Sequence, residues 1–310
     1  MYASPAEGRS AVAAFDLGST TTRGILAEPR DSAVLRVLAS GRETTSLGRG
    51  MTESRSFDPE GLDATVRFVV QTLERWGRPG QVHAVATAAA RDAANAPELL
   101  RRLRDEAGVR AEVIDGTVEA SLAWRGALSV DPHLAEHDPA VVDIGGRSTE
   151  VVLEEDGALH AVSRPLGARS FTEESERIGR DALIDGTGLD IARETLADAI
   201  RRAVQRDTVV CIGGTAEAVA HLTGRHRTSA AEIVDLNREL HALSLERRRE
   251  LMEFDPERAE IICAGLVILE AFARATRGHV VTLSEGGVRE GLLLDRTGAK
   301  ELVWPASVHS

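Results

Sequence analysis

The sequence predicts an α/β protein built from two related domains. One pattern occurs twice: an apolar run, an aspartate, a turn of glycine and hydroxyl residues, and a second apolar run. The first copy contains Asp16 and the second contains Asp143. Each copy has the form of a β-hairpin, and each is followed by alternating strand and helix patterns, as is typical of α/β domains. Two such hairpins predict two domains that face each other across a central cleft.

Length and composition predict a globular protein of the cytoplasm. The 310 residues suffice for two domains of ordinary size. No apolar run approaches the ~20 residues that a membrane span needs, and Met1–Ser10 has no apolar segment of the kind found in secretion signals. Cys211 and Cys263 both lie in apolar runs, which predicts buried, reduced thiols.

Charge restricts the possible ligands. The net charge of −12 argues against binding to nucleic acids or membrane surfaces. An anionic ligand would therefore need a local basic lining and a cation. Lys300 is the only lysine, so the phosphate loop that ends in Gly-Lys-Ser or Gly-Lys-Thr cannot exist. Any bound phosphate must be held by arginines, loop N–H groups and a metal ion.

Strand and helix patterns follow the same order in both halves. In the first half we expect strands at 12–16, 24–28, 35–40, 82–86 and 111–114, and helices at 58–76, up to 107 and at 119–127. In the second half we expect strands at 140–143, 150–154, 159–164, 208–212 and 280–283, and helices at 171–178, 189–204, in most of 225–275 and at 288–294.

These elements set the expected domain boundaries. We assign 11–128 to an N-terminal domain and 129–296 to a C-terminal domain, because prolines and polar residues cluster near 125–138. Residues 1–10 are expected to be a disordered tail and 297–310 a loose tail. Leu251–Ala273 carries apolar residues at helical spacing, which indicates either core or the interface of a homodimer.

The two turns are candidate phosphate-binding loops. Glycine lets the backbone approach an anion closely, and the N–H groups of such a loop can point inward as a cradle. Arg23 and Arg91 can each offer a forked pair of donors to a phosphate. The loop candidates are Asp16, Gly18, Ser19, Thr20 and Thr21 in the first copy, and Gly145, Gly146, Arg147, Ser148 and Thr149 in the second.

Asp143 and Glu150 flank the second turn and are candidate metal ligands. A hairpin brings the two carboxylates close together, and oxygen ligands suit Mg²⁺, usually with waters completing the octahedron. The structural alternative is that Asp143 caps its own turn and that Glu150 lies on a solvated strand face.

Further segments resemble motifs of a known family. These are Ala86–Ala93, Gly116–Ala120, Pro165–Ala168, Cys211–Thr215 and Glu285–Leu293. With the two hairpins, they resemble the superfamily of actin, sugar kinases and heat-shock chaperone ATPases. Within it, the details resemble the exopolyphosphatase and guanosine pentaphosphate phosphohydrolase (Ppx/GppA) family, in its short two-domain form. The resemblance spans residues 12 to 294 and implies two ribonuclease H-like domains, with the fold of the actin-like ATPase superfamily, that face a central cleft.

The resemblance also implies an activity and residue roles. It implies a phosphoanhydride hydrolase that uses Mg²⁺ to release a terminal phosphate from a phosphate chain. Glu119 corresponds to the family's catalytic glutamate, which orients or deprotonates the attacking water. Thr87, Arg91, Gly213 and Gly214 fall in segments that the resemblance assigns to substrate binding.

Three positions depart from the family pattern. Val118 stands where the family usually has a second acid, and Thr20 replaces an asparagine. Arg147 replaces a glycine, which removes a position free to adopt positive φ and adds a cation. Arg147 either reaches a phosphate or narrows the cleft.

Four functions remain open from the sequence. The first is an exopolyphosphatase acting on inorganic polyphosphate, and the second applies the same chemistry to guanosine pentaphosphate. The third is a sugar or acetate-type kinase. Glu119 and the segment Glu285–Leu293 argue against a kinase. The fourth is a sensor that binds polyphosphate or guanosine alarmones without turnover, which Val118 and Arg147 keep open.

Overall fold

The computed structural model describes residues 11–304, and the chain divides into two compact units. Unit 1 runs to Val130 and resumes at Gly286, whereas unit 2 is Asp131–Glu285. The predicted tail at 1–10 lies outside the described residues, as does the part of the predicted C-terminal tail from 305 to 310. Within residues 11–304, no helix combines the length and the apolar character needed to cross a bilayer.

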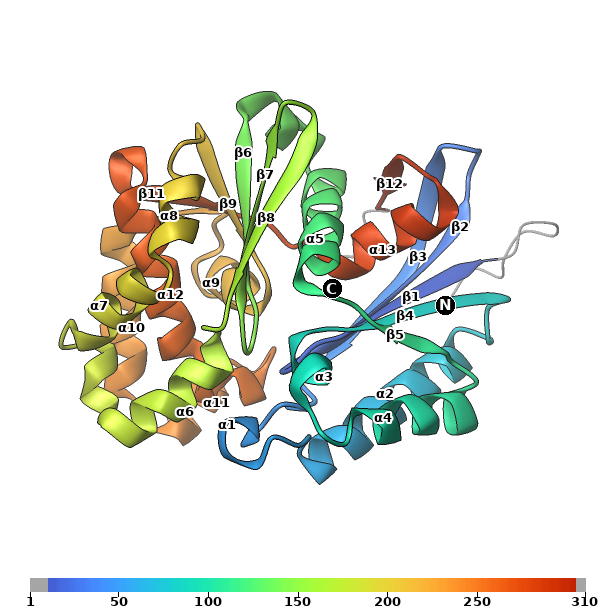
Figure 1. The fold of residues 1–310 in the computed structure, drawn as a ribbon, viewed down its shortest axis with the longest axis horizontal. Coiled ribbons are helices and arrows are strands. Elements are labelled where there is room, and N and C mark those ends of the chain that lie inside the picture. The colour runs from blue at the N-terminus through green and yellow to red at the C-terminus, as the bar shows by residue number, and fades with distance from the viewer. Residues whose placement is uncertain (1–10, 305–310) are drawn as a thin grey trace. The chain divides into compact units, whose positions relative to one another are not determined.

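Unit 1 contains a six-stranded sheet with the order β12-β3-β2-β1-β4-β5 (Figure 1). Its strands are β1 (Val12–Leu17), β2 (Thr22–Pro29), β3 (Val34–Glu43), β4 (Gln81–Ala86), β5 (Ala111–Val113) and β12 (Glu301–Val303). Strands β1, β2 and β3 form an antiparallel meander, and β4 and β5 continue the sheet parallel to β1.

Unit 2 repeats this arrangement in the order β10-β11-β9-β6-β7-β8. Its strands are β6 (Pro139–Ile144), β7 (Thr149–Glu155), β8 (Ala158–Arg164), β9 (Thr208–Ile212), β10 (Arg227–Ser229) and β11 (Val280–Leu283). An antiparallel meander, β6-β7-β8, is again followed by two strands parallel to its first strand, β9 and β11. The prediction of two related α/β domains is therefore confirmed.

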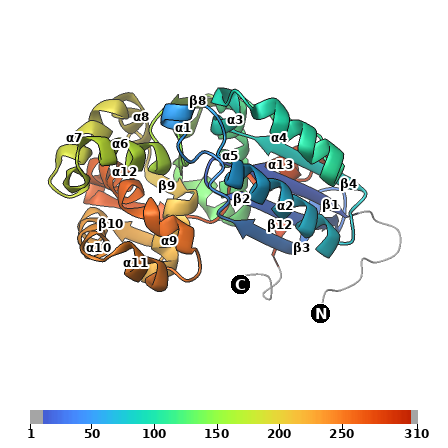
Figure 2. The ribbon, with the colours of Figure 1, turned by 90° about the horizontal axis from the view of Figure 1, so that it is seen from below.

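Helices pack on both faces of the unit 1 sheet. They are α1 (Met51–Ser54), α2 (Pro59–Arg75), α3 (Ala88–Asp92), α4 (Ala96–Arg102), α5 (Gly116–Val130) and α13 (Val288–Thr297), with a π-helical turn at Leu103–Ala107. Helix α2 begins where expected, because the Asp58 carboxylate accepts a hydrogen bond from the Gly61 amide at 2.8 Å and Pro59 occupies the first position. Figure 2 shows α2 in front of this sheet.

The C-terminal segment corrects the predicted domain boundary. Helix α13 and strand β12 belong to unit 1, although residues up to 296 were assigned to the second domain and 297–310 to a loose tail. Helix α13 packs closely against α5, where a Cβ on Gly126 would overlap the Gly287 carbonyl and one on Gly291 would overlap the Leu122 carbonyl. Such contacts between residues far apart in sequence leave no local signal, so the segment was misassigned.

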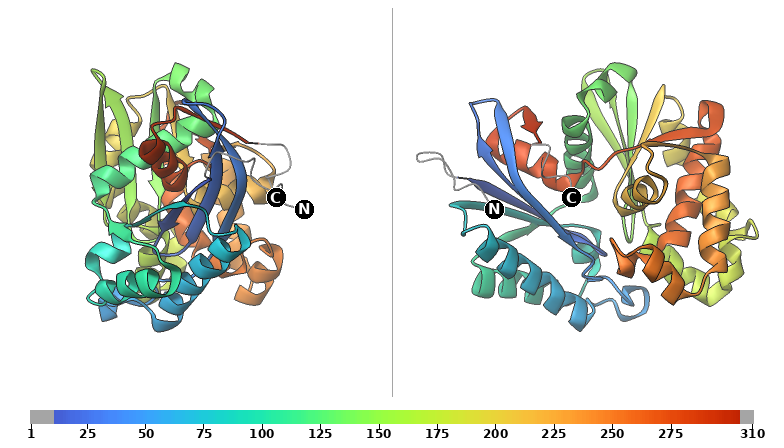
Figure 3. Two further views of the ribbon diagram at one scale, coloured as in Figure 1. Left: turned by 90° about the vertical axis from the view of Figure 1, so that its right-hand side faces the viewer. Right: turned by 180° about the vertical axis from the view of Figure 1, so that it is seen from behind.

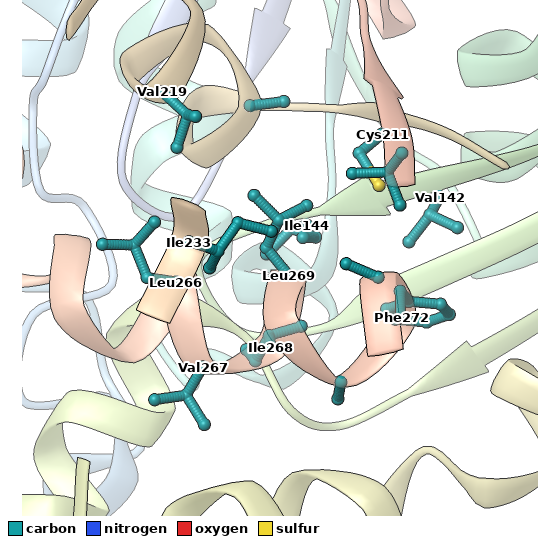
Figure 4. Packing of buried hydrophobic residues seen from close by; sticks show 14 of the residues in the cluster. Val142, Ile144, Cys211, Val219, Ile233, Leu266, Val267, Ile268, Leu269 and Phe272 are labelled. Carbon is teal, nitrogen blue, oxygen red and sulfur yellow. The ribbon is translucent and has the colours of Figure 1, made fainter. Parts of the chain in front are cut away.

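Unit 2 is organised around one buried helix, α12 (Ile262–Ala275). The other helices are α6 (Ala168–Ile178), α7 (Thr187–Thr195), α8 (Ala197–Ala203), α9 (Gly214–Thr223), α10 (Ala230–Ala242) and α11 (Leu245–Leu251), with short 3₁₀ turns between some of them. Leu266, Leu269 and Phe272 of α12 are fully buried in the core that also contains Val142 and Cys211 (Figure 4). Helices α10 and α12 lie side by side (Figure 3, right).

The burial of α12 decides between the two interpretations of 251–273. All its residues from Ile262 to Ala273 are buried within unit 2, so this helix is core. The expected homodimer therefore cannot use α12 as its interface.

Candidate active site

The first hairpin turn is a loop whose central amides are unsatisfied. The Gly18 amide donates to the Thr21 carbonyl at 3.2 Å and closes the turn. The Ser19 and Thr20 carbonyls accept from the Gly48 amide at 2.7 Å and the Ser46 amide at 2.8 Å. The amides of Ser19 and Thr20, however, donate no hydrogen bond to any residue between 11 and 304. Two adjacent unpaired N–H groups are what an anion-binding loop requires.

The loop is buried, and a buried N–H group without an acceptor is costly. Asp16, Ser19, Thr20 and Thr21 are all buried, and the Thr20 hydroxyl has no partner among the described residues. Asp16 lies directly opposite Arg23 in the β1–β2 register, so a carboxylate and a guanidinium flank the turn on neighbouring strands. The candidate residues of the first turn, Asp16 to Thr21, therefore lie together in the structure.

The parallel strands β1, β4 and β5 end at one edge of the unit 1 sheet. Leu17 pairs with Ala86, and Ala86 pairs with Val113, so the segments that follow these strands lie next to each other. The Thr87 amide reaches the Leu17 carbonyl at 3.5 Å, and the Ile114 amide donates to the Ala86 carbonyl at 3.1 Å. The turn after β1, Thr87 and the start of α5 therefore share this edge.

Arg91 and Glu119 meet at the same edge. Arg91 Nη1 donates to Glu119 Oε2 at 2.7 Å and to the Ile114 carbonyl at 2.9 Å. The Glu119 side chain is 9% exposed and that of Arg91 is 26% exposed. The predicted catalytic residue is thus a buried carboxylate held by a second predicted site residue.

Glu119 is not needed to cap its own helix. Asp115 Oδ1 accepts from the Thr117 and Val118 amides, both at 2.9 Å, and so satisfies the first turn of α5. Val118, which replaces the family's second acid, is 43% exposed. The Glu119 side chain is therefore available for its contact with Arg91 and is not used as the helix cap.

The second hairpin turn reproduces the first. The Gly145 amide donates to the Ser148 carbonyl at 3.0 Å, and the Gly145 and Gly146 carbonyls accept from the first amides of α6. The amides of Gly146 and Arg147 donate to no residue in the described range. Ser148 and Thr149 are buried, and Thr149 Oγ1 donates to the Leu166 carbonyl at 2.6 Å. The predicted equivalence of the two turns thus extends to their hydrogen bonds.

Asp143 and Glu150 lie directly opposite each other on β6 and β7. Glu150 is 1% exposed and accepts a hydrogen bond from Ser163 Oγ at 2.7 Å, so it does not lie on a solvated face. Ser163 is a partner that the sequence analysis missed, although the two-residue turn at Asp156-Gly157 sets the register that pairs Ser163 with Glu150. The two hairpins differ here, since unit 2 has a glutamate where unit 1 has Arg23.

Arg147 is directed toward helix α6. Its Nη1 lies 3.7 Å from Glu173 Oε2, and both side chains are less than a fifth exposed. Arg147 does not adopt a positive φ, so the replaced glycine is not required by the backbone here. Gly167 packs directly on the backbone of the turn, where a Cβ would overlap the Arg147 amide nitrogen.

Gly213 and Gly214 lie beside charged side chains of unit 2. Gly213 has a φ of +86°, and a Cβ there would come within 2.6 Å of Asp143 Oδ1. A Cβ on Gly214 would overlap the guanidinium of Arg258. Arg258 Nε donates to Asp255 Oδ2 at 3.0 Å, and both side chains are less than a tenth exposed. Arg258 was missed because its motif, an Asp-Pro helix start, has no catalytic signature.

The structure is an α/β protein with two similar hairpin turns whose central amides have no acceptor among the described residues. Residues 25–299 match the model of the Ppx/GppA phosphatase family. The chain belongs to this family, as its motifs predicted.

Curated relatives of the chain are also found, and a solved structure shares its fold. The chain is 29% identical to exopolyphosphatase 2 of Mycobacterium tuberculosis, over 93% of this chain and 98% of that protein. It is 27% identical to a guanosine-5′-triphosphate,3′-diphosphate pyrophosphatase of Photobacterium profundum, over 91% of this chain and 58% of that protein. The crystal structure of an exopolyphosphatase from Cytophaga hutchinsonii has the same fold, with a TM-score of 0.78, 20% identity and coverage of 94% and 99% of the two chains.

Proposed function

We propose that the protein is an exopolyphosphatase that hydrolyses the terminal phosphoanhydride bond of inorganic polyphosphate with Mg²⁺. The observation that carries the proposal is the buried Glu119 carboxylate, held by Arg91 at the strand edge where the Asp16–Thr21 loop also lies. The relative named exopolyphosphatase supports polyphosphate as the substrate, because it matches this chain over almost its entire length.

Each group has a defined task in this reaction. A water oxygen forms a bond to the terminal phosphorus while the bond to the bridging oxygen breaks, and the shortened chain leaves with that oxygen. Glu119 orients the water and accepts its proton. Unpaired loop amides, loop hydroxyls and Arg23 stabilise the charge on the phosphate oxygens.

The donor set of Asp143 and Glu150 fits Mg²⁺ held partly by waters and substrate. Mg²⁺ usually binds one or two carboxylates and retains several waters, and these two carboxylates are cross-strand neighbours. Between residues 11 and 304, no three His, Cys, Asp or Glu side chains gather into a metal cage. When bound, the ion would supply positive charge to the phosphate chain.

Guanosine pentaphosphate hydrolysis is the second candidate, favoured by the name of the Photobacterium relative. This chain covers only 58% of that protein, so the Photobacterium relative is the weaker guide to the substrate.

We place the enzyme in the cytoplasm, in keeping with two buried free cysteines. A homodimer is also part of the proposal, with its interface elsewhere than α12.

The substrate is tested by measuring phosphate release from short polyphosphate, long polyphosphate, guanosine pentaphosphate and ATP. We expect Mg²⁺-dependent release from polyphosphate and little from ATP. A preference for guanosine pentaphosphate would select the second candidate. Binding of these ligands without any release would identify a sensor.

A further inference from the structure

Unit 2 contains a hollow that none of the loop residues described above lines. It has a volume of about 650 Å³, within the range of about 300–1,000 Å³ that is typical of small-molecule pockets. Its walls come from α7, α10 and the end of α12, which lie near one another in unit 2 (Figure 1).

The lining of this hollow is basic. Arg193 comes from α7, Arg238 from α10 and Arg274 from α12, and His279 follows α12. Asp235 is the only acidic residue among the lining residues. Such a concentration of cations contrasts with the net charge of −12 for the whole chain.

Two of these arginines are exposed and have no ion-pair partner among the described residues. Arg274 Nε donates to Glu270 at 2.6 Å, so its charge is largely balanced. Neither Arg193 nor Arg238 makes an ion pair or a hydrogen bond with any residue that the structure describes. Two guanidinium groups from different helices therefore line one hollow without an acidic partner, which favours an anionic ligand.

Other groups at the hollow suit a phosphate chain. The hollow includes Ala230 and Ala231, whose first-turn amides in α10 have no acceptor within the helix. His279 Nδ1 lies 2.7 Å from the Arg274 carbonyl, which can only accept, so this nitrogen carries the hydrogen. That contact fixes the position of the imidazole ring at the rim.

We propose that this hollow binds a chain of phosphate groups at a site separate from the two hairpin loops. Arg193 and Arg238 provide forked donors to neighbouring phosphates, and the volume accommodates more than one phosphate group. The same chemistry could come from an inorganic oligophosphate or from the phosphates of a nucleotide. The inference does not depend on the proposed hydrolysis, because no catalytic candidate lines the hollow.

The test compares two double variants of equal charge change. All four arginines concerned are exposed. R193Q/R238Q removes the two that lack an ion pair, whereas R201Q/R202Q removes two arginines of α8 that line another hollow together with Glu155 and Asp198. Calorimetric titrations use the non-hydrolysable imido analogue of inorganic triphosphate, and a second series uses the imido analogue of ATP. Thermal melts establish that all three proteins are folded.

We expect R193Q/R238Q to lose one class of bound anion, with Kd rising by about tenfold or more as two charge-assisted contacts disappear. R201Q/R202Q should bind like the wild type. Tighter binding of the inorganic analogue would identify an oligophosphate site, and tighter binding of the ATP analogue a nucleotide site. Isotherms of R193Q/R238Q that match the wild type, or equal losses in both variants, would overturn the proposal. Phosphate release from polyphosphate by the same proteins reports separately on the proposed function.

Discussion

Arg91 and Glu119 are joined by a hydrogen-bonded ion pair of 2.7 Å between Nη1 and Oε2. The same Nη1 atom donates to the Ile114 carbonyl, so the backbone after β5 fixes the guanidinium while the guanidinium fixes the carboxylate. The two residues are 28 positions apart and reach this edge from α3 and α5. Arg91 therefore acts as a positioning residue for Glu119 in the structure.

Replacing Arg91 should impair the reaction more than the fold. In R91Q we expect kcat to fall by about 10²-fold, because a catalytic group displaced by about 1 Å can reduce the rate by that factor. Glu119 would be the displaced group, and KM should change less. Loss of the partner of a mostly buried carboxylate should lower the free energy of unfolding by about 1–3 kcal/mol. R101Q, which breaks an exposed pair with Asp105, is the control and should change neither quantity appreciably. Equal kcat values for R91Q and wild type would contradict the positioning role.

The magnesium assignment predicts a shift in metal requirement. D143N and E150Q should each raise the Mg²⁺ concentration for half-maximal activity by about tenfold or more, on the scale of weakened metal sites. EDTA should abolish activity in all proteins. The control is E154Q, which changes an exposed acid on β7, the strand that carries Glu150. E154Q should leave the Mg²⁺ concentration for half-maximal activity unchanged. A Mg²⁺ titration that is identical for D143N and wild type would rule out Asp143 as a ligand.

Close packing of α5 and α13 predicts an asymmetric response to alanine. A Cβ on Gly126 would overlap the Gly287 carbonyl, whereas one on Gly287 would meet nothing within 4 Å. G126A should therefore lower the free energy of unfolding by about 1–3 kcal/mol or more, and G287A should have little effect. Urea unfolding of both variants provides the comparison, and similar stabilities would show that the helices do not pack this closely.

The buried cysteines predict a loss of stability in alkali. Burial raises the pKa of both Cys211 and Cys263 above the ordinary value of 9.0. Above that pH the unfolded chain loses thiol protons that the folded chain retains, so stability falls as pH rises. Each thiol contributes a slope of at most roughly 1.4 kcal/mol per pH unit. Urea unfolding at about pH 8 and about pH 10 should show a shallower fall for C211A than for wild type, despite its lower absolute stability. An unchanged fall would contradict the contribution of Cys211.

Local sequence signals predicted most of the elements and both loops. The Asp-Pro start of α2 is a short-range feature, and the helix begins at the position that the sequence predicts. The two hairpins could be paired because their aspartates, glycines and hydroxyls have the same spacing. In both turns the amide of the glycine two residues after the aspartate donates to the carbonyl three residues later.

Long-range relationships could not be predicted in the same way. The membership of α13 and β12 in unit 1 depends on contacts of Gly126 and Gly291 that no local pattern encodes. The contact of Arg147 with Glu173 depends on where α6 lies beside the second loop. The contact of Arg258 with Gly214 depends likewise on the fold around α9.

The most direct test of the central claim is Mg²⁺-dependent phosphate release from polyphosphate by wild type, E119Q and E98Q. Glu98 is also an acid in the first turn of a unit 1 helix, but it is exposed, so it controls for loss of charge at a helix start. We predict that E119Q loses activity by about 10²-fold or more, as expected for removal of a general base, whereas E98Q keeps it. Retention of full activity by E119Q would contradict the assignment of Glu119 to the attacking water.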